Sequence, residues 1–174
     1  MASLDSIMKP RSIAVVGAST KPNTIGSDLL KRLIEYGFTG KIYPVNPKGG
    51  VIEGLTAYPS VFDIPGDVDL AIIVVKNTFV LSTIDQCHEK GITGLVVISA
   101  GFKETDEAGA ALEKELAAKV KAYGMRCVGP NCLGVVNTDP AVRMDGCFAE
   151  SLPQRGDIGF VSQSGALGGR SEER

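Results

Sequence analysis

The fold is decided by the stretch Ile13-Ala-Val-Val-Gly-Ala-Ser-Thr-Lys-Pro-Asn-Thr-Ile-Gly26. It begins with Ile13–Val16, a short and largely β-branched run of the kind found in buried strands. Gly17 then allows the backbone to turn sharply, and apolar residues recur at helical spacing from Ile25 onward. The stretch therefore predicts a strand, a polar loop and a helix, which is the repeating unit of parallel α/β sheets.

The same alternation continues along the chain. Continuous apolar runs over 70–75 and 95–98 are typical of strands buried on both faces of a parallel sheet. Pro44 lies inside another predicted strand, where it cannot donate a ladder hydrogen bond. We therefore predict the α/β class, with a doubly wound parallel sheet and right-handed crossovers. The predicted strands are 13–16, 41–45, 70–75, 95–98 and 126–128.

Three helices are predicted between these strands. Gly37 is the expected stop of the first helix. The second covers about 78–89, with Gly91 as the glycine that closes it. The third is capped by Thr105, with Gly124 as its stop. Apolar spacing predicts the buried faces of the first and third. These faces comprise Ile25, Leu29, Leu30, Leu33 and Ile34 in the first, and Ala108, Leu112, Leu116, Val120 and Tyr123 in the third.

The pattern changes near residue 138. Thr138–Arg155 has no clear periodicity, which predicts a linker or an irregular crossover. Ile158-Gly-Phe-Val161 then has the composition of a strand, and Ser162-Gln-Ser-Gly165 opens like a helix N-terminus. We expect residues 1–138 to form one domain, and residues 139–174 to hold a linker and the truncated start of a second.

Composition excludes several classes of function. The formal net charge is −2, with no cluster of Lys or Arg, which argues against nucleic acid as a partner. No apolar run approaches the ~20 residues that cross a bilayer, and the N-terminus lacks the plan of a signal peptide. The four cysteines show no Cys-x-x-Cys spacing, so neither a zinc site nor a disulfide framework is indicated. A reduced, cytoplasmic protein without membrane partners is expected.

The loop after the first strand has the chemistry of a phosphate site. Ser19 and Thr20 offer hydroxyl groups, Lys21 adds a charge, and the N–H groups at the start of the next helix favour anions. Gly26 follows Gly17 by nine residues, so the strict Gly-x-Gly-x-x-Gly dinucleotide fingerprint is absent. The looser turn could wrap a bulkier phosphate group. The alternative is an ordinary strand-to-helix turn with polar residues.

Lys48, in Asn46-Pro-Lys48, occupies the place where dinucleotide enzymes use an acid to bind the ribose 2′-hydroxyl. A cation at this point favours a ribose that carries its own phosphate. NADP, with a 2′-phosphate, and coenzyme A (CoA), with a 3′-phosphate, both qualify. A solvated surface lysine is the remaining alternative.

Two further loops follow predicted strands. Ser99-Ala-Gly-Phe102 has small residues that would let a ligand lie against the backbone, and Gly129-Pro-Asn-Cys132 brings an amide and a thiol to the same edge. Cys132 could be a nucleophile, but its segment holds no histidine to activate it, so a packed cysteine is favoured. The single histidine, His88, is expected to interact with carbonyls at a helix end rather than to act in catalysis.

Together these segments resemble a known family. Gly17-Ala-Ser-Thr20, Asn46-Pro-Lys48, Ile98-Ser-Ala-Gly-Phe102, Gly129-Pro-Asn-Cys132 and Phe160-Val-Ser-Gln-Ser-Gly165 occur in one order and spacing. They are similar to the Rossmann-like CoA-binding domain of NDP-forming acyl-CoA synthetases, which include ADP-forming acetate–CoA ligases and the succinyl-CoA synthetase alpha subunit. The resemblance extends over about residues 10–169.

The resemblance implies a ligand and a set of contacts. Gly17, Ala18, Ser19, Thr20 and Lys48 would contact the nucleotide and phosphates of CoA. The backbone of Ser99, Ala100 and Gly101 would line the path of the pantetheine, and Asn131 would lie near its thiol. Lys21 and Asn46, in the same two phosphate-binding loops, complete the expected set.

The resemblance also implies what is missing. The family's reaction, acyl-CoA + ADP + phosphate ⇌ acid + CoA + ATP, passes through an acyl phosphate and a phosphorylated histidine in a second domain, and it needs an ATP-grasp module. His88 does not match that histidine. We therefore expect this chain to bind CoA, to catalyse nothing alone, and to work with the remaining ligase and ATP-grasp domains of the same or a partner chain. The alternatives are a fragment of an NADP-dependent oxidoreductase and a CoA- or nucleotide-sensing regulatory module.

Overall fold

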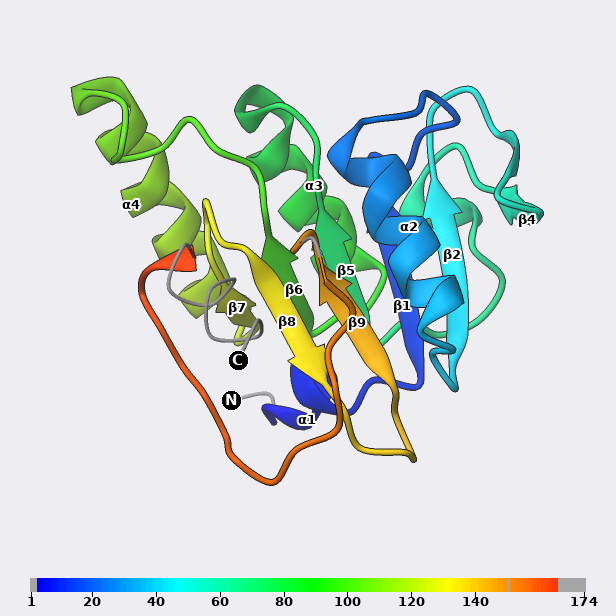
Figure 1. Ribbon diagram of the computed structural model, residues 1–174. Helices are drawn as coiled ribbons and strands as arrows, with labels where there is room; N and C mark the ends of the chain where they lie inside the picture. Colours follow the sequence, from blue (N-terminus) through cyan, green and yellow to red (C-terminus); the bar gives the residue numbers. More distant parts are fainter. Residues whose placement is uncertain (1–2, 150, 166–174) are drawn as a thin grey trace.

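The centre of the molecule is a parallel sheet of five strands (Figure 1). The computed structural model describes residues 3–149 and 151–165. The strands lie in the order β2-β1-β5-β6-β7, and all neighbours are parallel. Their bounds are β1 (Ser12–Val16), β2 (Lys41–Val45), β5 (Leu70–Ile73), β6 (Gly94–Val97) and β7 (Arg126–Val128). The predicted α/β fold with a doubly wound parallel sheet is confirmed.

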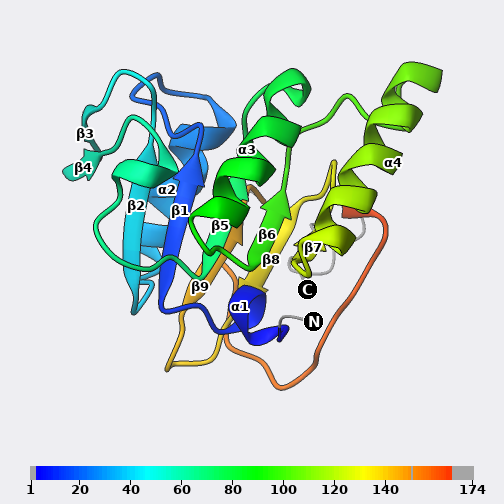
Figure 2. The same cartoon turned by 180° about the vertical axis from the view of Figure 1, so that it is seen from behind.

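Both faces of the sheet are covered, as the continuous apolar strands require. One face carries α2 (Ile25–Glu35) and an antiparallel hairpin of β8 (Gly134–Asn137) and β9 (Met144–Cys147), seen in front in Figure 1. The other carries α3 (Asn77–Glu89) and α4 (Glu107–Ala122), which come to the front in Figure 2. Short elements complete the fold: α1 (Asp5–Met8), β3 (Gly50–Ile52), β4 (Leu55–Ala57) and the 3-10 helix η1 (Val61–Asp63).

Pro44 is tolerated because β2 is an edge strand of the five-stranded sheet. Its missing N–H leaves the pairing with β1 intact from Lys41 to Val45. On the outer side, the Pro44 carbonyl accepts a hydrogen bond from the Tyr58 N–H at 2.9 Å. The predicted strand over 41–45 is therefore confirmed despite the proline.

The predicted buried face of α2 needs correction. In α2, Leu29, Leu30 and Leu33 are fully buried, but the predicted core residues Ile25 and Ile34 are exposed at 44% and 38%. The small residues Gly26 and Ser27 are buried in the first turn instead, because that turn lies against the backbone of the preceding loop.

The start of α4 also differs from the prediction. Its N-cap is Asp106, whose side chain accepts from the Gly109 N–H at 2.8 Å, whereas the Thr105 hydroxyl donates to the Phe102 carbonyl. Ala108, predicted to be buried, is exposed, and its neighbour Gly109 is buried. Leu116 is buried as predicted, with Leu112, Val120 and Tyr123 partly buried against the same core.

The prediction of irregular structure over Thr138–Arg155 is wrong for Met144–Cys147. This stretch forms β9, which is fully buried and packs against α2. Periodicity failed here because Asp145 and Gly146 interrupt any apolar pattern. Ile158–Val161, predicted as a strand, forms none, and Ile158 and Val161 are 93% and 99% exposed. The helix predicted from Ser162 would continue into residues outside those described.

A buried ion pair ties the hairpin to α2. Asp145 is completely buried, and its Oδ2 lies 2.8 Å from Nη2 of Arg32, which is 12% exposed. The Cys147 thiol donates to Asp145 Oδ1 at 3.0 Å. Arg32 also donates to the Ser151 carbonyl, so α2 holds both β9 and the segment that follows it.

Candidate functional site

The strand order creates a switch point between β1 and β5. The connection after β1 runs through α2 to β2 on one side, whereas the connection after β5 runs through α3 to β6 on the opposite face of the sheet (Figures 1 and 2). Ligands of open α/β sheets bind where such connections diverge, outside the carboxyl ends of the strands. All the predicted site residues lie in loops at this edge, at the top of Figure 1.

The Gly17 loop is packed between its two neighbours. The Gly17 N–H donates to the Val45 carbonyl of β2 at 3.0 Å. With φ at +101°, Gly17 lies so close to the loop after β5 that a Cβ would stand 3.1 Å from the carbonyl carbon and oxygen of Val74. A side chain at Gly17 would therefore meet both conformational strain and the backbone of the next loop.

Gly26 completes this loop from the helix side. A Cβ at Gly26 would stand 2.1 Å from the Gly17 carbonyl oxygen, so the first turn of α2 rests directly on the loop. Although nine residues separate the two glycines, the fold brings them into contact. Gly26 thus performs the helix-packing role of the third glycine in a dinucleotide fingerprint, which the spacing alone did not reveal.

The N-terminus of α2 is ordered by local hydrogen bonds. Thr24 caps it by accepting from the Ser27 N–H at 3.4 Å, and its hydroxyl donates to the Lys21 carbonyl. Ser19 Oγ accepts from the Lys21 N–H at 3.0 Å. Thr20 and Lys21 are exposed, and within the described residues their side chains have no partner. Ala18 is 1% exposed, its N–H donates to the Val15 carbonyl and its carbonyl accepts from Asn46, so Ala18 supports the turn from inside the loop.

Asn46 joins the loop after β2 to the loop after β1. Its Nδ2 donates to the Ala18 carbonyl at 2.7 Å, and its Oδ1 accepts from the Lys48 N–H at 2.9 Å. Both polar atoms of the Asn46 amide therefore form hydrogen bonds within the protein, and these bonds hold the backbone of Lys48 in position. The Lys48 ammonium is exposed and forms no ion pair in the part of the chain that the structure describes.

The loop after β6 is tied to the loop after β5. Ser99 is 8% exposed, and its hydroxyl donates to the Val75 carbonyl at 2.6 Å. Gly101, with φ at +98°, accepts at its carbonyl from Asn77 Nδ2 at 2.7 Å. Ala100 between them is exposed. The Ser99 hydroxyl is thus a structural group, and the exposed face of this loop is the small Ala100.

Asn131 lies at the same edge. Its N–H donates to the Ser99 carbonyl at 3.0 Å, and its φ of +52° places it in the left-handed region that asparagine tolerates. The residue is exposed. The structure therefore brings the loops that hold Gly17, Lys48, Ser99 and Asn131 to one edge.

Cys132 is held as a packed thiol. It donates to the Val97 carbonyl at 3.3 Å, and burial raises its pKa to about 11. Burial likewise raises the pKa of Cys87, Cys127 and Cys147 to about 12. The favoured interpretation of Cys132 as a bystander rather than a nucleophile agrees with this environment.

We accordingly expect all four cysteines to react slowly with Ellman's reagent in the folded protein at pH 8, where a thiol of pKa about 11 is ionised in roughly one molecule per thousand. In denaturant all four should react fast. A fast native thiol that Cys132→Ser removes would contradict this expectation.

His88 lies away from the site, in the last turn of α3. Its ring stacks on Tyr123, the residue directly after α4, with centroids 3.9 Å apart, rather than interacting with helix-end carbonyls as predicted. The Tyr123 hydroxyl donates to Asp85 at 2.7 Å, so these side chains join the two helices.

No group of His, Cys, Asp or Glu that could hold a metal ion occurs among residues 3–149 and 151–165.

Sequence reasoning missed the loop after β5. The run 70–75 was predicted as one strand, but β5 ends at Ile73, and Val74–Asn77 forms part of the edge. The available signal was Lys76, a charged residue directly after a buried central run. The contacts of Val75 and Asn77 with the loop after β6 depend on the fold and are not visible in the sequence.

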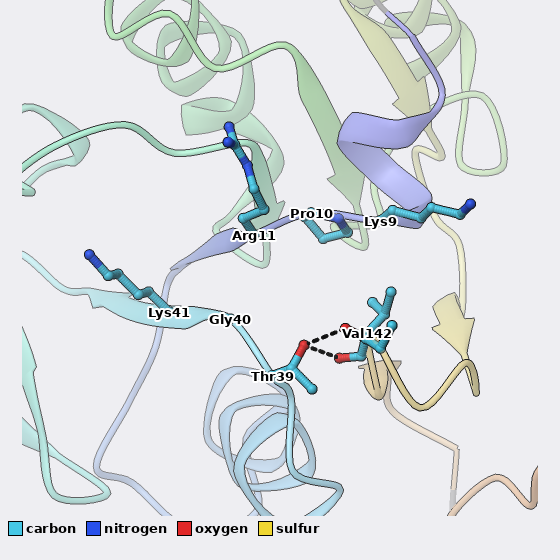
Figure 3. Close-up of a pocket in the computed structure, with 8 residues that line it drawn as sticks. Lys9, Pro10, Arg11, Thr39, Gly40, Lys41 and Val142 are labelled. Atoms are coloured by element: carbon cyan, nitrogen blue, oxygen red, sulfur yellow. Dashed lines mark hydrogen bonds between the residues drawn. The ribbon is translucent and has the colours of Figure 1, made fainter.

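A separate pocket lies at the opposite edge of the sheet. It has a volume of about 520 Å³ and is lined by Lys9, Pro10, Arg11, Thr39, Gly40, Lys41, Ala141 and Val142. Figure 3 shows the side chains of Lys9, Arg11 and Lys41 pointing away from one another. Arg11 is also paired with Asp69 at 3.2 Å. The three cations thus do not converge on one anion, and this pocket is not the functional candidate.

Within the described residues, none of the helices has the length and apolar character to span a membrane.

Residues 11–138 match the family of CoA binding domains. The alpha subunit of ADP-forming acetate–CoA ligase II from Pyrococcus furiosus is 48% identical over 165 residues, which are 95% of this chain and 35% of that protein. The 4-hydroxybutyrate–CoA ligase (ADP-forming) of Nitrosopumilus maritimus is 44% identical over 161 residues, 92% of this chain and 23% of that protein.

A solved structure of a related enzyme also matches this chain. Dinucleotide-forming acetyl-coenzyme A synthetase 1 of Ca. Korarchaeum cryptofilum, in complex with phosphate and ADP, superposes with a TM-score of 0.91 at 43% identity. The match covers 99% of this chain and 36% of that one, so the chain spans about a third or less of the length of these relatives. The chain belongs to the family of CoA-binding domains, and it is a module homologous to the alpha subunits of NDP-forming acyl-CoA synthetases.

Proposed function

We propose that this module binds CoA at the carboxyl edge of its sheet and serves an NDP-forming acyl-CoA synthetase. The observation that carries the proposal is that the N-terminus of α2, packed on Gly17 through Gly26, and the exposed, unpaired Lys48 lie on neighbouring loops at the carboxyl edge of the sheet. CoA would be a substrate of the complete enzyme, which converts acyl-CoA, ADP and phosphate to acid, CoA and ATP.

Each loop has a role in this proposal. Ser19, Thr20 and Lys21 would hold the diphosphate at the start of α2, on a loop whose turn Gly17 and Ala18 form. Lys48, positioned by Asn46, would hold the 3′-phosphate. The Ser99–Gly101 loop would line the pantetheine, and Asn131 would lie near its thiol.

The proposal includes partners. The catalytic parts, a histidine-bearing ligase domain and an ATP-grasp module, would belong to the same or a partner chain in the cytoplasm, and the module alone would catalyse nothing. The exposure of three apolar residues in one short segment, Ile158, Phe160 and Val161, supports this, because contiguous exposed apolar residues mark interaction surfaces.

Thermal unfolding with four ligands tests the proposal. A ligand at 100 times its Kd adds about 2.7 kcal/mol to the free energy of unfolding, so CoA should raise Tm by several degrees. Dephospho-CoA should raise it less, and NAD should have little effect. Stabilisation by NADP without stabilisation by CoA would instead favour the oxidoreductase alternative.

Lys48→Ala is expected to weaken CoA binding by about 1.5–3 kcal/mol, the range for a charge-assisted hydrogen bond, and to weaken dephospho-CoA binding much less. Calorimetry measures both affinities. Lys9→Ala, which removes an exposed lysine at the opposite edge of the sheet, is the control. Equal CoA affinity in the wild type and Lys48→Ala would make Lys48 a solvated surface lysine.

A further inference from the structure

The loop after β5 carries a lysine that no prediction above has used. We propose that Lys76 is a further cationic residue of the CoA site, beside Lys21 and Lys48, and that it binds the diphosphate from the side of the Gly17 loop opposite Lys48. This inference rests on the proposed function and names the recognition of one chemical group within it.

The neighbours of Lys76 are each fixed to a site loop. The Val74 N–H donates to the Val16 carbonyl at 2.9 Å, which holds this loop against Gly17. The Val75 carbonyl accepts from the Ser99 hydroxyl. Lys76 therefore stands in a segment whose position relative to the site is fixed by specific contacts.

The residue after Lys76 is fixed in the same way. Asn77 Nδ2 donates to the Gly101 carbonyl at 2.7 Å. In the whole segment Val74–Asn77, the Lys76 side chain alone is exposed, and it has no hydrogen bond or ion pair within the described residues. The structure thus fixes the backbone around Lys76 and leaves its ammonium available to a ligand.

The local electrostatics favour an anion at this point. Lys76 is the N-cap of α3, and no side chain caps this helix. A lysine cannot accept hydrogen bonds from the first N–H groups, and its charge adds to the positive end of the helix dipole. A phosphate oxygen nearby would satisfy both the helix and the ammonium.

The strand order places the loops of Lys48 and Lys76 on opposite sides of β1. β2 and β5 lie on either side of β1, and neighbouring strands are about 4.8 Å apart, so the loops of Lys48 and Lys76 begin about 10 Å from each other. CoA carries two separate anionic groups, a 3′-phosphate and a 5′-diphosphate. One cation on each side of the Gly17 loop fits a ligand with two such groups.

The test is calorimetry of CoA and dephospho-CoA on the wild type, Lys76→Ala, Lys76→Arg, Lys48→Ala and the control Lys9→Ala. Lys76→Ala should weaken both ligands by a similar factor of at least tenfold, because both carry the diphosphate. Lys76→Arg should retain most of the affinity. Lys48→Ala should weaken CoA more than dephospho-CoA. Thermal unfolding without ligand checks that each variant is folded.

The outcomes separate this inference from the proposed function. If the wild type binds CoA and Lys76→Ala binds it as tightly as Lys9→Ala does, the inference about Lys76 is overturned while CoA binding stands. A selective loss of CoA over dephospho-CoA in Lys76→Ala would also overturn it, because Lys76 would then contact the 3′-phosphate. No binding of CoA by the wild type would refute the proposed function itself.

Discussion

Asp145→Ala is expected to lower the free energy of unfolding by about 3–5 kcal/mol, the cost of removing one partner from a buried ion pair. Asp145 is completely buried against Arg32, which is 12% exposed. The substitution would leave the guanidinium largely out of water without its counter-charge, and the Cys147 thiol without its acceptor. Urea unfolding measures the change.

Two variants serve as controls for this prediction. Asp157→Ala removes the same charge from an exposed position and should change stability by less than about 0.5 kcal/mol. Arg32→Met combined with Asp145→Leu replaces the pair by apolar groups and should recover much of the loss. If Asp145→Ala unfolds at the same urea concentration as Asp157→Ala, the ion pair contributes no stability.

Gly26→Ala is expected to destabilise the protein by about 3 kcal/mol, the upper end of the usual range for overpacking. The new Cβ would stand 2.1 Å from the Gly17 carbonyl oxygen. The Cβ position is set by the backbone and the atom that it meets is a backbone oxygen, so no side-chain rotation relieves the contact, and the first turn of α2 must move from the Gly17 loop. CoA affinity should fall at least tenfold in the same variant.

The matched control is Gly156→Ala, because a Cβ at Gly156 has no atom within 4 Å and its φ is unstrained. This variant should keep wild-type stability and CoA affinity. Comparing the two by urea unfolding and calorimetry isolates the contact with Gly17 from the general effect of replacing glycine. A Gly26→Ala protein with unchanged stability would mean that the loop and helix are not closely packed in solution.

The elements that the sequence predicted best are those whose patterns are local. Leu70–Ile73 and Gly94–Val97 are buried on both faces, and their apolar runs follow from that burial alone. The predicted bounds of Lys41–Val45 and Arg126–Val128 also match, although these edge strands are only partly buried. By contrast, Met144–Cys147 contains Asp145 and Gly146, so its strand depends on pairing with β8 and packing against α2.

The candidate site divides in the same way. Motif spacing identified which loops meet at the carboxyl edge, because parallel strands bring their ends together wherever they lie in the sequence. It did not reveal that the side chains of Asn46 and Ser99 are used in bonds to neighbouring loops. Nor did it identify Lys76, whose significance depends on β5 lying beside β1.

By itself, then, the sequence determined the α/β class, the order along the chain of the five sheet strands and the three helices between them, the glycine and lysine loops and the resemblance to CoA-binding domains. Tertiary structure alone decided that Gly26 rests on Gly17, that Arg32 neutralises Asp145, and which polar side chains remain available to a ligand. The physical reason is the range of the interactions. Helix and strand preferences act between near neighbours in the chain, whereas packing contacts and buried charges join residues that only the folded sheet brings together.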